Sequence, residues 1–292
     1  MEELFANLTA EEPDSPMSEH IPKNSPFLDH VIKTTSGCLP STASRMDLAI
    51  SKETGDDRVV PEGYAQMLLP NFSNVPVQTE EIVQSITWND QGAQVQSNKG
   101  IYQTKAVVLT VSVGVLQSQK IQFHPPLPTN KQDAIKNIKM GLAERICMVC
   151  DIDESWINGY LLVEMDDVVV GLECFPFGQN FVSAYIAGPK STSQNISDIS
   201  LQALRKAGYQ GTIHQIHASQ WHKNPFVVGS YSAAAIHHTK ARRELANSFP
   251  PLFFAGEATN PEDYGTVHGA YESGTRVAQE VRHWLNLNIQ TD

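Results

Sequence analysis

The chain has 292 residues, enough for one large or two ordinary domains, and its 41% hydrophobic content is sufficient for a real core. Its 32 acidic and 21 basic residues give a formal net charge of −11, which disfavours binding to nucleic acids or anionic membranes and favours cationic partners. No apolar run approaches the ~20 residues of a membrane span, and residues 1–20 are acidic rather than signal-like. We therefore expect no membrane span and favour a cytoplasmic location.

The N-terminal quarter predicts little regular structure. Residues 1–27 are rich in Glu, Ser and Pro and predict a disordered arm, and residues 27–51 predict at most one or two helical turns. Beyond a turn, the pattern predicts a helix at 64–69 and strands at 75–88, 93–97 and 101–113, with a hairpin turn at 89–92. The almost continuously apolar run 107–111 is typical of a strand buried on both faces.

The Pro125-Pro126-Leu127-Pro128 run marks a crossing into a second structural region. Helices and strands are predicted there in alternation: a helix at 131–140, strands at 145–150, 161–170, 172–176 and 181–187, a helix at 197–207 and a strand at 213–220. A final helix at 267–285 carries one apolar stripe. This order predicts an α/β plus α+β fold, in which a mixed-sheet region is interrupted by an inserted antiparallel sheet.

Cysteine and histidine spacing predicts no metal site. A C-x-x-C pair lies in a strand-like run, where residues three apart point to opposite faces, and no second pair completes a zinc site. Free thiols are expected at all four cysteines: Cys38, Cys147, Cys150 and Cys174. Three nearby histidines lack helical spacing and an evident carboxylate partner: His214, His217 and His222.

The stretch from Leu252 to Gly274 is the most informative part of the chain. An apolar strand runs into Gly256-Glu257, and a polar loop then leads to a helix whose first turn carries Gly265, Thr266 and Gly269. A carboxylate beside a helix N-terminus offers an acceptor for hydroxyl groups and unpaired N–H groups for an electron-rich ligand edge. An ordinary strand–loop–helix connection with closely packed glycines explains the local pattern equally well.

Several ordered segments decide between these readings. The C-terminal stretch resembles the FAD-dependent amine oxidases, a family of polyamine and spermine oxidases, monoamine oxidases and flavin-dependent histone lysine demethylases. Four other segments match the family: a turn at 56–64, a strand and turn at 108–117, the Pro-Pro-Leu-Pro segment at 121–131, and the Trp-x-x-Asn-Pro…Gly-Ser-Tyr-Ser segment at 221–232. The turn departs from the family in one residue, because Glu62 stands where the family has glycine.

The resemblance implies a partial FAD-binding domain at 55–128 and 248–288, with a substrate-binding region at 129–247. The family's G-x-G-x-x-G turn, which cradles the pyrophosphate, is missing, because no two of the 18 glycines are two residues apart. This departure leaves the pyrophosphate without its usual N–H groups.

The resemblance also assigns roles to individual residues. Glu257 matches the glutamate at the FAD ribose and linker, and the Val267 N–H matches the donor to flavin N1/O2. Lys131 matches the lysine that holds a water near N5, and Tyr231 matches one wall of the amine cage, with Thr266 opposite. The expected cofactor-binding set is Val83, Thr110, Ser112, Gly256, Glu257, Thr266 and Val267, and the expected catalytic set is Lys131, Tyr231 and Thr266.

The implied activity is oxidative deamination of an amine, with hydride transfer to flavin N5 and reduction of O2 to H2O2. Threonine rather than tyrosine at position 266 favours a polyamine-like or lysine-like substrate over an arylalkylamine. Two alternatives stay open: a catalytically inactive truncated or partner-dependent half, and an L-amino-acid oxidase, which needs an arginine for the carboxylate. The sequence leaves the oligomeric state open.

Overall fold

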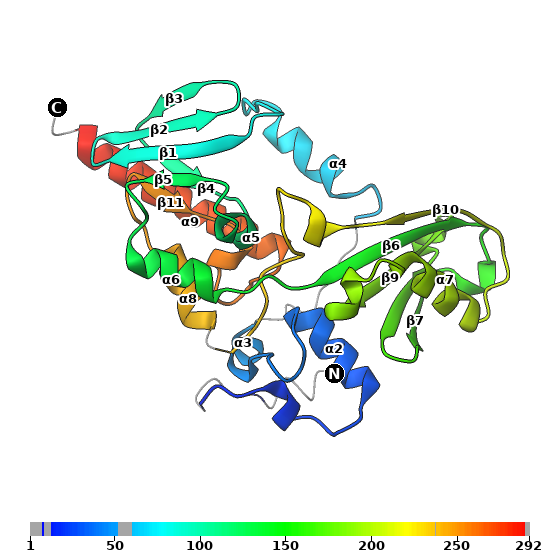
Figure 1. Cartoon of the computed structure of the whole chain (residues 1–292). Coiled ribbons are helices and arrows are strands. Elements are labelled where there is room, and N and C mark those ends of the chain that lie inside the picture. The colour runs from blue at the N-terminus through cyan, green and yellow to red at the C-terminus, as the bar shows by residue number, and fades with distance from the viewer. Residues whose placement is uncertain (1–7, 9–12, 52–59, 237, 290–292) are drawn as a thin grey trace.

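Three sheets organise the residues that the computed structural model describes, which are 8, 13–51, 60–236 and 238–289 (Figure 1). The first sheet has the strand order β3-β2-β1-β5, in which β5 runs parallel to β1 and the other neighbours are antiparallel. Its strands are β1 (Val83–Asn89), β2 (Gly92–Ser97), β3 (Ile101–Thr104) and β5 (Gln122–His124). The predicted hairpin turn is confirmed, since Asn89 pairs with Gly92.

The second sheet contains only two parallel strands, β4 (Val107–Leu109) and β11 (Leu252–Phe254). The predicted strand 101–113 is therefore wrong as a single element: it comprises β3, β4 and the start of α5. The chain turns into α5 because the Ser112 side chain caps that helix, accepting a hydrogen bond from Val115 N at 3.1 Å. Burial of β4 on both faces is also not found, since Val108 is 42% exposed.

Helices cover the two-stranded sheet and the first sheet. Leu109, Leu252 and Phe254 are buried against α6 and α8, whereas Phe253 packs on the other side with Val277 of α9. The bounds of the helices around this region are α4 (Tyr64–Leu68), α5 (Val113–Gln117), α6 (Thr129–Asn137), α8 (His238–Ala246) and α9 (Val267–Ile289).

The third sheet is antiparallel throughout, with the order β10-β6-β9-β8-β7, and confirms the expected inserted antiparallel sheet. One face packs on α7 (Ile196–Lys206) through a core that includes Met148, Leu172 and Leu204. The predicted strand 161–170 is instead a hairpin. The strands are β6 (Ala143–Cys150), β7 (Gly159–Glu164), β8 (Val169–Cys174), β9 (Phe181–Ala187) and β10 (Ile213–Ala218).

Residues 13–27 correct the expectation of a disordered arm at 1–27, of which residues 1–7 and 9–12 lie outside the described residues. From Pro13 to Phe27 the chain is ordered: Met17 is fully buried, and its N–H donates to Ala43 O at 3.0 Å. Residues 27–51 hold more helix than expected, in α2 (Pro26–Ser36) and α3 (Arg45–Ile50). Composition does not reveal this order because Met17, Ile32 and Leu48 are buried against distant residues such as Ala234.

Short 3₁₀ turns connect these elements: η1 (Met17–Glu19), η2 (Leu69–Phe72), η3 (Glu154–Trp156), η4 (Pro176–Gly178), η5 (Pro189–Thr192), η6 (Trp221–Lys223) and η7 (Glu257–Thr259). Within the described ranges, no helix is both long and apolar enough to cross a membrane. The described part of the expected turn at 56–64 is limited to residues 60–64, because residues 52–59 lie outside the described residues.

Candidate functional site

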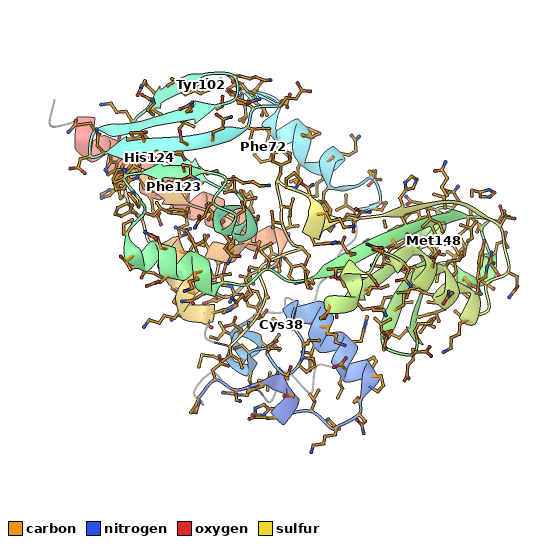
Figure 2. All side chains as sticks on the ribbon, viewed as in Figure 1. Cys38, Phe72, Tyr102, Phe123, His124 and Met148 are labelled. Atoms are coloured by element: carbon orange, nitrogen blue, oxygen red, sulfur yellow. The ribbon has the colours of Figure 1, made fainter. Side chains whose placement is uncertain are left out.

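Tyr231 lies where α2, the five-stranded sheet and the start of α9 meet. Its hydroxyl donates to the Thr34 carbonyl at 2.7 Å and lies 3.4 Å from the Tyr185 hydroxyl. Its ring packs on Gly37 and Gly265, where an added Cβ would come within 3.0 and 3.3 Å of the ring. Figure 2 labels Cys38, the residue after Gly37, in the central part of the molecule beside the end of α2. Burial raises the pKa of Tyr231 well above its usual value, so the phenol stays neutral.

Glu257 connects the end of β11 to the segment that carries Tyr231. Gly256 turns the chain with a φ of +123°, a conformation that favours glycine. The Glu257 carboxylate then accepts hydrogen bonds from Ser232 N (2.9 Å), Ser232 Oγ (2.6 Å) and Gly265 N (2.7 Å). The carboxylate therefore fixes Tyr231 relative to the beginning of α9.

The N-terminus of α9 presents backbone donors beside this junction. Thr266 caps the helix: its Oγ1 accepts from Gly269 N at 3.0 Å and donates to Asp263 O at 2.6 Å. The first intrahelical bond runs from Ala270 N to Thr266 O, so the N–H groups of Val267 and His268 have no acceptor within the helix. Because α9 has 23 residues, its N-terminus also carries the positive end of a helix dipole.

The structure brings together most, but not all, of the residues expected at the site. Gly256, Glu257, Thr266, Val267 and Tyr231 form one connected junction. Thr110 follows β4, the strand paired with β11, and its carbonyl lies 3.9 Å from a Cβ built on Gly256. Two members of the expected cofactor-binding set lie apart from the junction: Ser112, whose hydroxyl donates to Val227 O and caps α5, and Val83, which begins β1 and packs on the core of the first sheet.

Lys131 is not available for a water at the flavin. The side chain is 1% exposed, and Nζ donates to the carbonyls of Glu244 (2.5 Å), Leu245 (3.0 Å) and Asn247 (2.5 Å) at the C-terminal end of α8. Nζ also lies 5.2 Å from the ring centre of Phe254. The ammonium group satisfies carbonyls that α8 leaves without internal donors, so the expected catalytic placement of Lys131 is wrong.

The segment that contains Tyr231 is also anchored at its beginning. Glu144 of β6, 2% exposed, accepts from Ser219 Oγ (2.5 Å), Trp221 N (3.1 Å), His222 N (3.3 Å) and His222 Nδ1 (2.7 Å). Burial alone would raise the pKa of Glu144, but these hydrogen bonds outweigh it and the pKa is lowered. The buried carboxylate thus holds the Trp221 turn on the sheet.

Two of the three histidines have the carboxylate partners that the sequence did not reveal. His222 pairs with Glu144, and His214 lies 2.7 Å from Asp151. No group of three or more His, Cys, Asp or Glu side chains suited to a metal ion occurs among the residues that the structure describes.

Sequence reasoning missed a set of polar and aromatic residues on the face of the five-stranded sheet opposite α7, which α2 partly covers. Arg145 of β6 lies over the ring of Tyr185 on β9, 5.2 Å from its centre. Its Nη1 atom donates to Glu173 Oε2 at 3.1 Å and to Ser183 Oγ at 3.0 Å. The available signal was the strand alternation, because Arg145 and Tyr185 interrupt apolar runs at positions that face away from the core.

Comparisons with known proteins identify the class. The family profile of flavin-containing amine oxidoreductases matches residues 46–282, so the chain belongs to this family. Lysine-specific histone demethylase 1 homolog 2 of Arabidopsis thaliana is 29% identical over 281 residues, covering 86% of this chain and 37% of the relative. Polyamine oxidase 4 of Oryza sativa subsp. japonica is 28% identical over 243 residues, covering 78% of this chain and 50% of the relative.

The fold has a solved counterpart. A redesigned double mutant of putrescine oxidase superposes with a TM-score of 0.75 at 16% identity, covering 97% of this chain and 73% of that chain. This likeness concerns the fold alone. The chain spans 37% and 50% of the length of the two curated relatives described above.

The family is flavin-containing, and FAD is the cofactor. The residues present fit its isoalloxazine and ribose parts. The first-turn N–H groups of α9 suit an electron-rich carbonyl edge. Among the described residues Glu257 Oε1 accepts from Ser232 N alone, so it retains a lone pair for a hydroxyl. These 292 residues contain no G-x-G turn of the type that cradles a pyrophosphate.

Proposed function

We propose that the chain forms the amine-binding and isoalloxazine-facing part of a flavin amine oxidase that deaminates polyamine-type amines. The observation that carries this proposal is the junction of Tyr231, Glu257 and the α9 N-terminus, held together by the hydrogen bond from Gly265 N to Glu257 at 2.7 Å. Bound FAD would supply the hydride acceptor and pass its electrons to O2, giving H2O2.

The residues of the junction orient the reactants and need not act as a strong base. The Tyr231 hydroxyl is already committed to the Thr34 carbonyl, which leaves the aromatic ring as its contribution to the amine site. The N–H groups at the start of α9 would stabilise negative charge at the flavin edge. An amine that binds in its neutral form needs no proton removed by a side chain before its C–H bond breaks.

Three observations support a polyamine-type substrate over other amines. The net charge of −11 favours cationic ligands. Thr266, with its hydroxyl used as a helix cap, leaves more space opposite Tyr231 than a second tyrosine would. The relatives include a polyamine oxidase of rice, although histone demethylases are also among them.

Reconstitution with FAD tests the proposal. The purified chain is incubated with FAD, freed of excess cofactor and examined by visible absorption, and peroxide is then measured with spermine, benzylamine and a methyl-lysine peptide. Retained flavin and peroxide production with spermine support the proposal. Flavin-loaded protein that oxidises none of the three amines refutes it.

A second candidate function is that of a partner-dependent half that binds no FAD alone. The flavin-facing strands β4 and β11 form a sheet of only two strands, and an apolar groove along it is lined by Val108, Val277 and Val281. A chain that stays colourless with FAD, and retains flavin only when a glycine-rich βαβ polypeptide is added, would favour this candidate.

A further inference from the structure

The chain adopts an unfavourable backbone conformation three residues before Tyr231. Val228 has a φ of +57°, in the left-handed region that β-branched residues rarely occupy. Such a conformation costs free energy and persists only where the surrounding contacts determine it. The contacts that hold Val228 therefore show what the position of Tyr231 depends on.

The beginning of α5 holds this turn from one side. The hydroxyl of Ser112 donates to the carbonyl of Val227. Gly114, in the first turn of α5, leaves room for the turn and no more: a Cβ added there would lie 2.9 Å from the Val228 Cβ and closer still to the Val228 carbonyl oxygen. The start of α5 therefore fits closely against the Val228 turn.

Hydrogen bonds within the segment support the turn from the other side. The N–H groups of Val227 and Val228 both donate to the carbonyl of Asn224, at 3.1 and 2.9 Å. The N–H of Gly229 donates to the Trp221 carbonyl at 3.3 Å. None of these three bonds uses the Val227 carbonyl, which is the group that Ser112 holds.

Beyond the turn, the backbone of Tyr231 is paired with the chain that leads into β6. Ser230 N donates to Gly141 O at 3.0 Å, and Gly141 N donates to Tyr231 O at 2.6 Å. Gly229 packs directly on Met140, since an added Cβ would lie 2.5 Å from the Met140 Cβ. The short connection from Val228 to Tyr231 thus has little freedom, and a shift of the turn would move the Tyr231 ring.

Ser112 links this segment to the strand on the cofactor side. It follows Thr110, whose carbonyl lies beside Gly256, by two residues. Its Oγ accepts from Val115 N at 3.1 Å as the cap of α5 while its hydroxyl hydrogen is donated to Val227 O. One hydroxyl can do both, because it carries a donor and acceptor lone pairs.

We propose that Ser112 is a positioning residue for the amine site. It holds the Val228 turn against α5 and so sets the orientation of the Tyr231 ring relative to the end of β4. The proposal rests on the proposed function, which places the amine at Tyr231. It deepens that function by giving Ser112, which lies apart from the junction, an effect on the reaction through Val228.

Four variants of the full chain separate the bond to Val227 from the helix cap. Ser112→Asp keeps an acceptor for Val115 N but has no proton to donate at neutral pH, whereas Ser112→Ala loses both functions. Ser112→Thr keeps the hydroxyl and should restore wild-type behaviour. The control, Ser118→Ala, removes a hydroxyl that donates to Val115 O within the same helix.

Hydrogen exchange followed by mass spectrometry measures the link without any ligand. In residues 226–233 we expect exchange to accelerate about five- to tenfold in Ser112→Asp and Ser112→Ala, and less than about twofold in Ser112→Thr and Ser118→Ala, because one hydrogen bond no longer opposes local opening. In residues 113–119, Ser112→Ala should exchange faster and Ser112→Asp should not.

Three exchange results would overturn the proposal. The first is unchanged exchange at 226–233 in both Ser112→Asp and Ser112→Ala. The second is acceleration by the same factor throughout the chain, which reports a loss of global stability rather than a local link. The third is a Ser112→Thr variant that exchanges as fast as Ser112→Asp.

Kinetics of the FAD-loaded chain test the consequence for the reaction. Ser112→Asp should lower kcat for spermine about five- to tenfold and leave KM within about twofold, because a displaced ring leaves the amine bound but poorly oriented. Faster local exchange with unaltered kcat would refute the positioning role and retain the oxidase. FAD-loaded wild type that forms no peroxide would refute the proposed function, while the exchange result still decides whether Ser112 holds the Tyr231 segment.

Discussion

Replacement of Lys131 by methionine separates a structural role of this lysine from a catalytic one. The methionine keeps an apolar stem of similar length against Phe254 but removes the ammonium group that donates to the carbonyls of Glu244, Leu245 and Asn247. With about 1 kcal/mol net for each lost hydrogen bond, the free energy of unfolding should fall by about 3 kcal/mol near pH 10.5, and by less at neutral pH, where burial of the charged ammonium offsets part of these bonds. The loss should be the same with and without FAD.

The pH dependence of the unfolding free energy gives a second expected magnitude for Lys131→Met. Burial lowers the pKa of Lys131 from 10.5 in the unfolded chain to about 8 in the fold. Between these values the unfolded chain holds a proton that the folded chain has released, so raising the pH stabilises the fold. At about 1.36 kcal/mol per pKa unit, wild type should gain up to about 3 kcal/mol relative to Lys131→Met between pH 8 and 10.5.

Urea denaturation followed by circular dichroism measures both effects. Lys136→Met is the matched control, because Lys136 lies on the exposed face of the same helix. The control should unfold like wild type across the pH range. The structural assignment of Lys131 is refuted if Lys131→Met retains full stability near pH 10.5, or if the two unfolding free energies run parallel from pH 8 to 10.5.

Three further predictions concern the junction and its supports. Tyr231→Phe keeps the ring and loses one hydrogen bond, so the free energy of unfolding should fall by about 1–2 kcal/mol and the melting temperature by about 2–6 °C. Amine binding should change little, and a large loss of binding would contradict a purely aromatic role of Tyr231. Gly269→Ala places a Cβ 1.9 Å from the Asp263 carbonyl oxygen and should lower the free energy of unfolding by about 1–3 kcal/mol. Gly274→Ala adds a Cβ with no atom within 4 Å and should raise that free energy by about 0.5–1 kcal/mol. Equal effects of the two substitutions in urea unfolding would refute the packing argument. The folded pKa of Glu144 lies below its usual 4.5, so the stability that its carboxylate contributes is present above pH 4.5 and is lost as the pH falls through the folded value. The difference in unfolding free energy between wild type and Glu144→Gln should therefore narrow in acid. A difference that stays constant with pH would contradict a stabilising role of the Glu144 carboxylate.

Local sequence patterns were sufficient for much of the fold. The strand predicted at 181–187 is β9, with the same ends, and the helix predicted at 267–285 is the main part of α9. Both have strong periodicity over their whole length, and a one-sided apolar pattern depends only on neighbours a few residues away. The strand–loop–helix at Gly256 to Gly269 likewise placed Glu257 and the helix start together before any tertiary contact was known.

The sequence by itself determined the apolar faces of the strongly periodic elements and which family the chain resembles, but not what the buried polar groups contact. Lys131 follows a proline-rich signature, yet its ammonium is held by carbonyls 113 to 116 residues away. Tyr231 reaches Thr34 across 197 positions, and Arg145 meets Glu173 across 28. Hydrophobic periodicity carries no record of such partners, because they depend on how strands and helices pack after they form. Only the tertiary structure therefore moved Lys131 out of the site and brought Arg145, Tyr185 and Glu173 beside it.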